Sequence, residues 1–246
     1  MPQIITCAVI KGGTGKTTTA AAIAQAAVKD GRRVLCVDMD AQANLTFITG
    51  ADKDAPGSYE LLKGAAIADT IQRTAQGLDV IAGAPMLANE KTTSGSINRL
   101  KDALEGIKRK YDLIVIDTPP ALSELTYNAL MASNGALIPL ETDAQAIQGL
   151  FMIHEVIRKI QTKNKPLKLL GCIVTKYDKR PQINRYYLDG IKQSAEAEKI
   201  PYLMEIRQGI AIREAQTMRQ SIFDYAPKSK PAEDYQTLYN KIIYGG

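Results

Sequence analysis

The sequence predicts an α/β fold with a doubly wound, mostly parallel β-sheet flanked by helices. Two observations support this prediction. Short apolar segments alternate along the chain with helical patterns, and the chemically distinctive residues come directly after the apolar segments. Strands that are apolar on both faces and joined by helices are typical of buried parallel sheets, which bind ligands at the carboxyl ends of their strands.

The elements follow from local patterns. Residues 4–10 are short, apolar and rich in β-branched side chains, which predicts a first strand, and a helical pattern covers residues 16–30. Gly31 is well placed to end that helix. Further strands are expected at residues 34–37, 78–81, 113–116, 136–140 and 169–174. Further helices are expected at residues 97–109, 123–133, 146–161 and 182–198, and a last one after a turn at 226–231. Residues 51–74 show no clear pattern.

Length and composition indicate one large domain over residues 1–246, because 246 residues with 45% hydrophobic composition can bury a sizeable core. No apolar run reaches the roughly 20 residues that span a bilayer, and the N-terminus lacks a signal pattern. A cytoplasmic protein with no membrane partner is therefore expected. Cys7, Cys36 and Cys172 lie in apolar runs and are too widely spaced for a short metal-binding motif, so they are expected to be buried thiols.

The net charge of +5 is unevenly distributed along the chain. Residues 1–150 carry a net charge of −2, whereas residues 151–246 carry +7. Such asymmetry fits a surface that meets polyanions, and a solvated basic face explains it equally well.

The loop between the first strand and the first helix predicts a phosphate-binding site. Its glycines let backbone N–H groups surround phosphate oxygens at the positive end of the helix, Lys16 adds positive charge near the β- and γ-phosphates, and Thr17 can bind Mg²⁺. The loop residues expected to bind ATP are Lys11, Gly12, Gly13, Thr14, Gly15, Lys16, Thr17 and Thr18.

This loop departs from the general phosphate-loop pattern. Ile10 occupies the place of the first glycine, and a second lysine, Lys11, follows it. Lys11 is poorly placed for its own nucleotide, but it could reach the nucleotide of a facing subunit, much as an arginine finger does. The alternative is a solvated loop lysine.

Three acidic residues follow predicted strands. Asp38 and Asp117 are expected to support Mg²⁺ together with Thr17, and Asp40 could orient the attacking water. Taken alone, an Asp at a strand end is usually a turn former or a helix cap. With the phosphate loop beside them, Lys11, Lys16 and Asp40 become the candidate catalytic residues.

Together these motifs resemble the ParA family of partition ATPases, which belongs with Soj and MinD to a group of phosphate-loop ATPases with a deviant Walker A loop. The resemblance is carried by the two-lysine loop, by DMDAQAN at residues 38–44 and by DTPP at residues 117–120. It runs nearly end to end and includes, less specifically, Arg213-Glu214-Ala215 and residues 225–235.

The resemblance implies a switch driven by ATP and Mg²⁺. Two subunits would sandwich two ATP molecules, with Lys11 of each reaching the other's nucleotide, and this homodimer would bind nonspecific DNA at the nucleoid. A ParB-like centromere-binding partner would stimulate hydrolysis and so release the DNA. The chain begins at the first strand, so the small family form without an N-terminal DNA-binding domain is expected.

The resemblance also implies further site residues. Thr175 stands where relatives contact adenine, and Arg207 is a second candidate for ATP binding. Relatives usually have Pro at Ala41 and often have a DNA-binding Arg near Ala211, so both departures bear on switching and DNA binding. The candidate DNA-binding residues are Lys176, Arg185, Arg207, Arg213 and Arg219.

Other functions fit the motifs less well. A MinD-like or other cargo-positioning ATPase that does not act on DNA remains the main alternative, but the apolar stripe of the last helix, from Tyr235 to Ile243, is better suited to packing than to a membrane. An electron-transfer role like that of nitrogenase iron protein lacks suitably placed cysteines. A tyrosine autokinase would need a C-terminal tyrosine cluster, and only Tyr244 lies at the very end.

Overall fold

The computed structural model of this protein describes residues 2–89 and 96–245. The strands are β1 (Gln3–Cys7), β2 (Val34–Asp38), β3 (Ile71–Arg73), β4 (Asp79–Ile81), β5 (Leu113–Asp117), β6 (Gly135–Leu140), β7 (Lys168–Tyr177) and β8 (Tyr202–Arg207). The helices are α1 (Lys16–Lys29), α2 (Asn44–Thr49), α3 (Ser58–Leu62), α4 (Arg99–Glu105), α5 (Glu124–Ala132), α6 (Ala146–Gln161), α7 (Gln182–Ala197), α8 (Ile210–Thr217), α9 (Ile222–Tyr225) and α10 (Lys230–Tyr244). Short 3₁₀ segments are η1 (Ile67–Thr70), η2 (Pro85–Asn89), η3 (Ser96–Asn98) and η4 (Lys108–Lys110).

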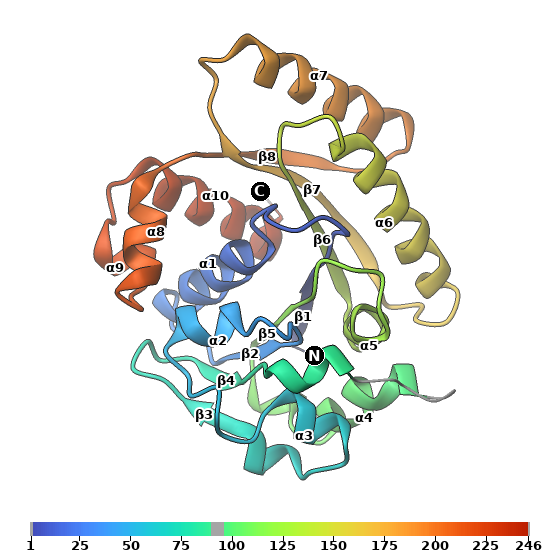
Figure 1. The fold of residues 1–246 in the computed structure, drawn as a ribbon, viewed down its shortest axis with the longest axis vertical. Coiled ribbons are helices and arrows are strands. Elements are labelled where there is room, and N and C mark those ends of the chain that lie inside the picture. Colours follow the sequence, from blue (N-terminus) through green and yellow to red (C-terminus); the bar gives the residue numbers. More distant parts are fainter. Residues whose placement is uncertain (1, 90–95, 246) are drawn as a thin grey trace.

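The strands form an eight-stranded sheet in the order β3-β4-β2-β5-β1-β6-β7-β8 (Figure 1). Neighbouring strands are parallel except β3 and β4, which are antiparallel. The predicted doubly wound, mostly parallel sheet is therefore confirmed. From β1 the chain passes to β2 and the edge strand β3, returns through β4 to β5 beside β1, and then runs outward through β6 and β7 to β8. β1 therefore has β5 on one side and β6 on the other.

Helices cover both faces of the sheet. Side chains of α1, α2, α8, α9 and α10 join one face of the sheet in one hydrophobic cluster. Those of α3, α4 and α5 pack on the other face over β2 and β5, and α5, α6 and α7 continue that layer over β6 and β7. The strands are buried from both sides, which explains why they are apolar throughout.

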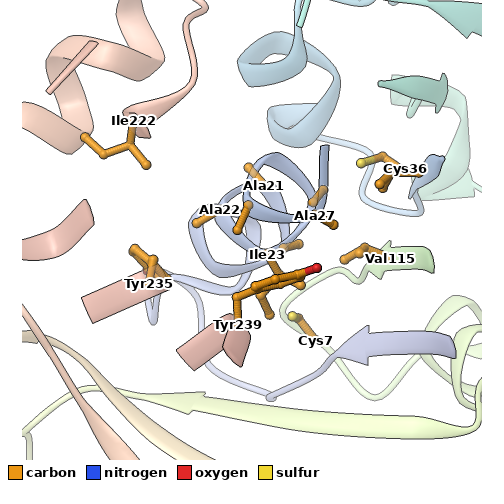
Figure 2. Packing of buried hydrophobic residues seen from close by; sticks show 14 of the residues in the cluster. Cys7, Ala21, Ala22, Ile23, Ala27, Cys36, Val115, Ile222, Tyr235 and Tyr239 are labelled. Atoms are coloured by element: carbon orange, nitrogen blue, oxygen red, sulfur yellow. The ribbon is translucent and has the colours of Figure 1, made fainter. Parts of the chain in front are cut away.

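Helices α1 and α10 pack against each other on the same face of the sheet, and the side chains of both belong to one buried cluster (Figure 2). The alanines of α1, including Ala21, Ala22 and Ala27, are small enough for the two helices to approach closely, and the buried rings of Tyr235 and Tyr239 fill the space. Gly31 ends α1 as expected: it has φ +76°, and its N–H donates to the Val28 carbonyl over 2.9 Å.

The predicted element boundaries differ from the structure in identifiable places. The first strand ends at Cys7, because the chain then leaves the sheet for the loop, and the expected helix at 97–109 is α4, which is shorter. Residues 51–74, which showed no pattern, contain α3, η1 and β3. Strand β8 and helices α2, α8 and α9 were not expected.

The expectation of buried thiols is confirmed. Cys7, Cys36 and Cys172 are free and buried, and burial raises the pKa of each thiol. Within residues 2–89 and 96–245, no helix is both long enough and apolar enough to cross a membrane.

Candidate functional site

The site forms where β1, β2 and β5 end. Cys7 of β1 is paired with Asp117 of β5, and Asp117 with Asp38 of β2, so the segments that follow these strands meet at one edge of the sheet. Helix α1 begins directly after the loop, at Lys16, which brings its N-terminal N–H groups to the same edge.

The loop backbone has the conformation that phosphate binding requires. Gly13 and Gly15 have φ values of +80° and +77°, in the left-handed region that favours glycine. A Cβ at Gly15 would also lie 3.1 Å from the Thr175 Oγ1. The carbonyl of Thr14, whose side chain is buried, accepts a hydrogen bond from this hydroxyl over 2.9 Å. Thr175 therefore fixes the loop from the end of β7.

The loop borders a cleft of about 590 Å³. The cleft walls come from the loop, α2 and α8, together with Asp40, Pro120 and Lys176. Lys16 lines it with its side chain 5% exposed, and the Lys16 Nζ donates to the Lys11 carbonyl over 3.0 Å. Burial lowers the pKa of Lys16, while the charges of Asp117 and Asp40 oppose that change. Thr18 also lines the cleft, and its hydroxyl accepts from the Gln216 amide over 3.0 Å.

Thr17 and Asp117 form the pair that best fits a magnesium site. The Thr17 hydroxyl donates to the Asp117 Oδ2 over 2.6 Å. The other oxygen, Oδ1, is buried and has no hydrogen-bond partner among the described residues, which leaves it available to a cation or its water. Mg²⁺ commonly takes one or two protein ligands and completes its shell with waters and phosphates. No cluster of three or more His, Cys, Asp or Glu side chains suited to a metal occurs in the described part of the chain, which is compatible with that mode.

Asp38 has hydrogen-bond partners on both carboxylate oxygens, and its expected support of Mg²⁺ stays a prediction. Its Oδ1 accepts from the Asp40 N–H over 3.0 Å, and its Oδ2 accepts from the N–H and hydroxyl of Thr46, each over 2.8 Å. Asp38 therefore organises the segment that carries Asp40. Asp40 itself is 7% exposed and lines the cleft.

The pKa values of the buried carboxyls Asp38 and Asp117 are both raised, chiefly by burial. Burial raises the pKa of Asp38 to about 6. Burial, followed by the charge of Asp38, raises the pKa of Asp117 to about 8. Two carboxyls this close together favour the binding of a cation beside them, next to the phosphates of a nucleotide in the cleft.

Lys11 lies at the outer edge of the loop. Its Nζ is 2.6 Å from the Asp143 Oδ2, in the segment between β6 and α6, and its side chain is 35% exposed. In a single subunit this lysine is thus held by an ion pair next to the cleft. Its expected reach to a facing subunit stays a prediction.

A second cleft of about 520 Å³ adjoins the first and has Gly15, Thr18 and Thr175 in its wall. Arg207 also lines it, but the Arg207 guanidinium binds Asp234 through two nitrogens, with Nη2–Oδ1 at 2.7 Å and Nε–Oδ2 at 2.9 Å. Asp234 and Glu233 keep the pKa of Arg207 above its usual value. The structure thus gives Arg207 a partner within the chain.

The remaining basic candidates are dispersed. Arg185 is exposed on α7, and Arg213 is exposed on α8, where it lines both clefts. Arg219 lies over the Phe47 ring, 4.7 Å from its centre. Lys176 points at the phosphate-binding loop. Lys176, Arg207 and Arg213 line the second cleft together, whereas Arg185 and Arg219 are not among the lining residues of either cleft.

Several residues of the site were missed by the sequence analysis. Glu141 and Asp143 follow β6 at the same sheet edge as Asp38 and Asp117, so the same rule about strand ends could have found them. Gln216 acts through a contact with Thr18, which is 198 positions away in the sequence. Thr46 contacts Asp38, eight positions before it, but no motif that we recognised indicates either residue.

Fold and site together define a nucleotide-binding protein with a phosphate-binding loop. A family model described as an AAA domain matches residues 2–169. The chain is 34% identical to the sporulation initiation inhibitor protein Soj of Bacillus subtilis, with 100% of both chains covered. It is 31% identical to the chromosome-partitioning ATPase Soj of Thermus thermophilus, covering 95% of this chain and 92% of that one. A ParA family protein of Chlamydia muridarum is 32% identical, covering 95% of this chain and 94% of its own. The chain belongs to the ParA family of ATPases.

Solved structures share the fold over nearly the whole chain. A structure described as cobyrinic acid a,c-diamide synthase from Mycobacterium smegmatis, with bound ADP and magnesium, has a TM-score of 0.85 at 31% identity and covers 99% of this chain and 94% of that one. The cell division ATPase MinD of Pyrococcus furiosus has a TM-score of 0.83 at 27% identity, with 100% of both chains covered.

Proposed function

We propose that this protein is a magnesium-dependent ATPase that hydrolyses ATP to ADP and phosphate and acts as a DNA partition switch. The observation that carries the proposal is the meeting of Lys16, Thr17 and Asp117 beside a cleft, in a chain that is similar along its whole length to Soj. Residues 1–246 would act as one domain, because both layers of helices pack on one sheet.

Each part of the site has a proposed role. The backbone of residues 11–18 and Lys16 hold the phosphates, and Thr175 and Arg207 border the space for the nucleoside. Thr17 and Asp117 would hold Mg²⁺, which supplies positive charge to the β- and γ-phosphates when bound, and Asp38 would support this site by fixing the neighbouring segment. Asp40 is suited to orient the attacking water, because its carboxylate lies at the cleft.

The proposed cycle couples this chemistry to DNA. Two subunits would face each other across their loops, and Lys11 would exchange Asp143 for the partner's nucleotide. The ATP-bound homodimer would bind nonspecific DNA at the nucleoid, with Lys176, Arg185, Arg207, Arg213 and Arg219 as the candidates from the sequence. A ParB-like centromere-binding protein would stimulate hydrolysis and release the DNA.

The decisive experiment is retention of nonspecific duplex DNA by the pure protein with ATP, ADP or no nucleotide, across a salt series. We expect ATP-dependent retention that weakens steeply with salt, because phosphate contacts release counterions. Lys11→Ala should abolish retention while still binding nucleotide, since the Lys11 side chain contacts Asp143, and the variant keeps the Lys11 carbonyl that accepts from Lys16. Nucleotide uptake without DNA retention in the wild type would contradict the partition role.

A MinD-like positioning ATPase is the second candidate, favoured by the similarity to MinD along the whole chain. Against a membrane-binding last helix, Tyr235, Leu238 and Tyr239 of α10 are buried, and Ile242 and Ile243 pack against the same cluster. Flotation with anionic lipid vesicles and ATP separates the two: binding to vesicles without binding to DNA would favour the MinD-like function.

A further inference from the structure

Lys176 has an unusual backbone at the end of β7. Its φ is +52°, in the left-handed region that residues other than glycine seldom adopt. The pairing of β7 with β8 also shifts register between Val174 and Tyr177, as at a β-bulge. Bulges near functional sites commonly redirect a side chain. Here the irregularity aims Lys176 away from the sheet and toward the phosphate-binding loop.

The ammonium group of Lys176 has two partners. Its Nζ donates to the Gly13 carbonyl over 2.5 Å and lies 2.5 Å from the Glu141 Oε1. Gly13 follows β1, Glu141 follows β6 and Lys176 lies near the end of β7, and these three strands are consecutive in the sheet. The lysine thus bridges the loop and the segment after β6, at the wall shared by both clefts.

A second lysine is held in the same way. Lys11 pairs with Asp143, two residues after Glu141, so one short segment supplies the carboxylates for both lysines. The Lys176 side chain is 53% exposed and that of Glu141 is 28% exposed, so water and ligands can reach the pair. A polyphosphate entering the clefts would compete with Glu141 for this ammonium, because a phosphate oxygen also attracts an ammonium group and a polyphosphate carries more charge than one carboxylate.

We propose that Lys176 is a nucleotide-positioning residue. Without nucleotide, Glu141 holds the Lys176 ammonium beside Gly13. When a nucleoside diphosphate or triphosphate binds, the ammonium moves to its phosphate chain. It adds a positive charge to that of Lys16. The inference rests on the proposed nucleotide binding. A purely structural ion pair would give both residues the same effect on nucleotide affinity. In this proposal their effects are opposite, because Lys176 attracts the nucleotide, whereas Glu141 competes with it for the ammonium.

The test is the dissociation constant of a fluorescent ATP analogue with Mg²⁺ for four proteins: wild type, Lys176→Met, Glu141→Gln and Lys168→Met. We expect Lys176→Met to weaken binding by about tenfold, and Glu141→Gln to tighten it by about threefold. Lys168 lies exposed at the opposite end of β7, so Lys168→Met removes the same charge far from the clefts and should match the wild type.

The outcomes separate the possibilities. If Lys176→Met and Glu141→Gln weaken binding of the analogue equally, the ion pair is only structural and the proposal is overturned. Wild-type affinity in Lys176→Met would overturn it as well. Thermal unfolding without nucleotide identifies a variant that fails to fold, and Lys176→Arg, which keeps the charge, should then retain most of the affinity. Failure of the wild type to bind the analogue would instead refute the proposed ATPase function.

Discussion

At the scale of single residues, Gly15 satisfies two constraints at once. Its φ of +77° costs an L-residue about 1–2 kcal/mol, and its missing Cβ leaves room for Thr175. The first constraint belongs to the backbone alone, whereas the second belongs to the contact between the loop and β7. The two can be separated, because Gly50 has the nearly identical φ of +78°, and a Cβ added there would meet nothing within 4 Å.

We predict that Gly15→Ala abolishes the rise in unfolding temperature caused by Mg²⁺ and ATP, whereas Gly50→Ala retains it. Both variants should lose stability through backbone strain, of about 1 kcal/mol or more. Only Gly15→Ala also displaces Thr175 and thereby the loop. Thermal unfolding with and without nucleotide measures both effects, and an intact nucleotide response in Gly15→Ala would show that the contact with Thr175 is dispensable.

At the scale of elements, α10 is fastened to the end of α1. Tyr239, at 1% exposure, donates its hydroxyl to the Asp30 Oδ2 over 2.6 Å, and Tyr244 and Arg32 contact the same carboxylate. The Tyr239 hydrogen bond, followed by those of Tyr244 and Arg32, lowers the pKa of Asp30 from 3.8 to about 2. The ionised carboxylate is therefore favoured in the folded protein.

We predict that Tyr239→Phe lowers the unfolding temperature at neutral pH and that its difference from the wild type narrows as pH falls. Because the pKa of Asp30 is lower in the folded protein, the ionised carboxylate stabilises the fold at pH values above its ordinary pKa of 3.8. This contribution to the free energy of unfolding disappears as pH falls through about 2. The ring and its packing are kept. Thermal unfolding of both proteins between pH 7 and about pH 2 checks the prediction, and a difference that does not change with pH would exclude Asp30 as its source.

The elements also show which information the sequence carries. Buried strands such as β5 and long helices such as α6 are recognisable because burial imposes a continuous pattern. Helix α8 has eight residues of which only Ala215 is buried, and β8 is a half-buried edge strand, so neither has a distinct pattern. The phosphate loop and Asp117 follow from local motifs. The pairing of Arg207 with Asp234 joins residues 27 positions apart and depends on the folded arrangement.

At the scale of the whole molecule, the positive charge of the second half is partly neutralised within the fold. Arg207 is held by Asp234, Arg180 by Asp178, and Lys192 by Glu205. Arg185 and Arg213 are exposed on α7 and α8. These two arginines are therefore better suited than Arg207 to a contact with DNA.

We predict that Arg185→Ala and Arg213→Ala each weaken ATP-dependent DNA binding and reduce the slope of log K against log salt by about 0.9 per lost phosphate contact. Arg207→Ala should chiefly lower the unfolding temperature, because it leaves the buried carboxylate of Asp234 without its guanidinium. Salt titrations of DNA binding, together with thermal unfolding, distinguish these effects. An unchanged salt slope in both exposed variants would place the DNA surface elsewhere.

The position of β1 in the sheet has a consequence for how the nucleotide can enter and leave. β1 is hydrogen-bonded on both sides and buried beneath two helical layers, so local unfolding should reach it last. Helices α2 and α8, which form walls of the cleft, have only six and eight residues. Nucleotide exchange can then proceed by displacement of α2 and α8. The loop and β1, which carries it, would stay in place and present the same binding surface to each nucleotide.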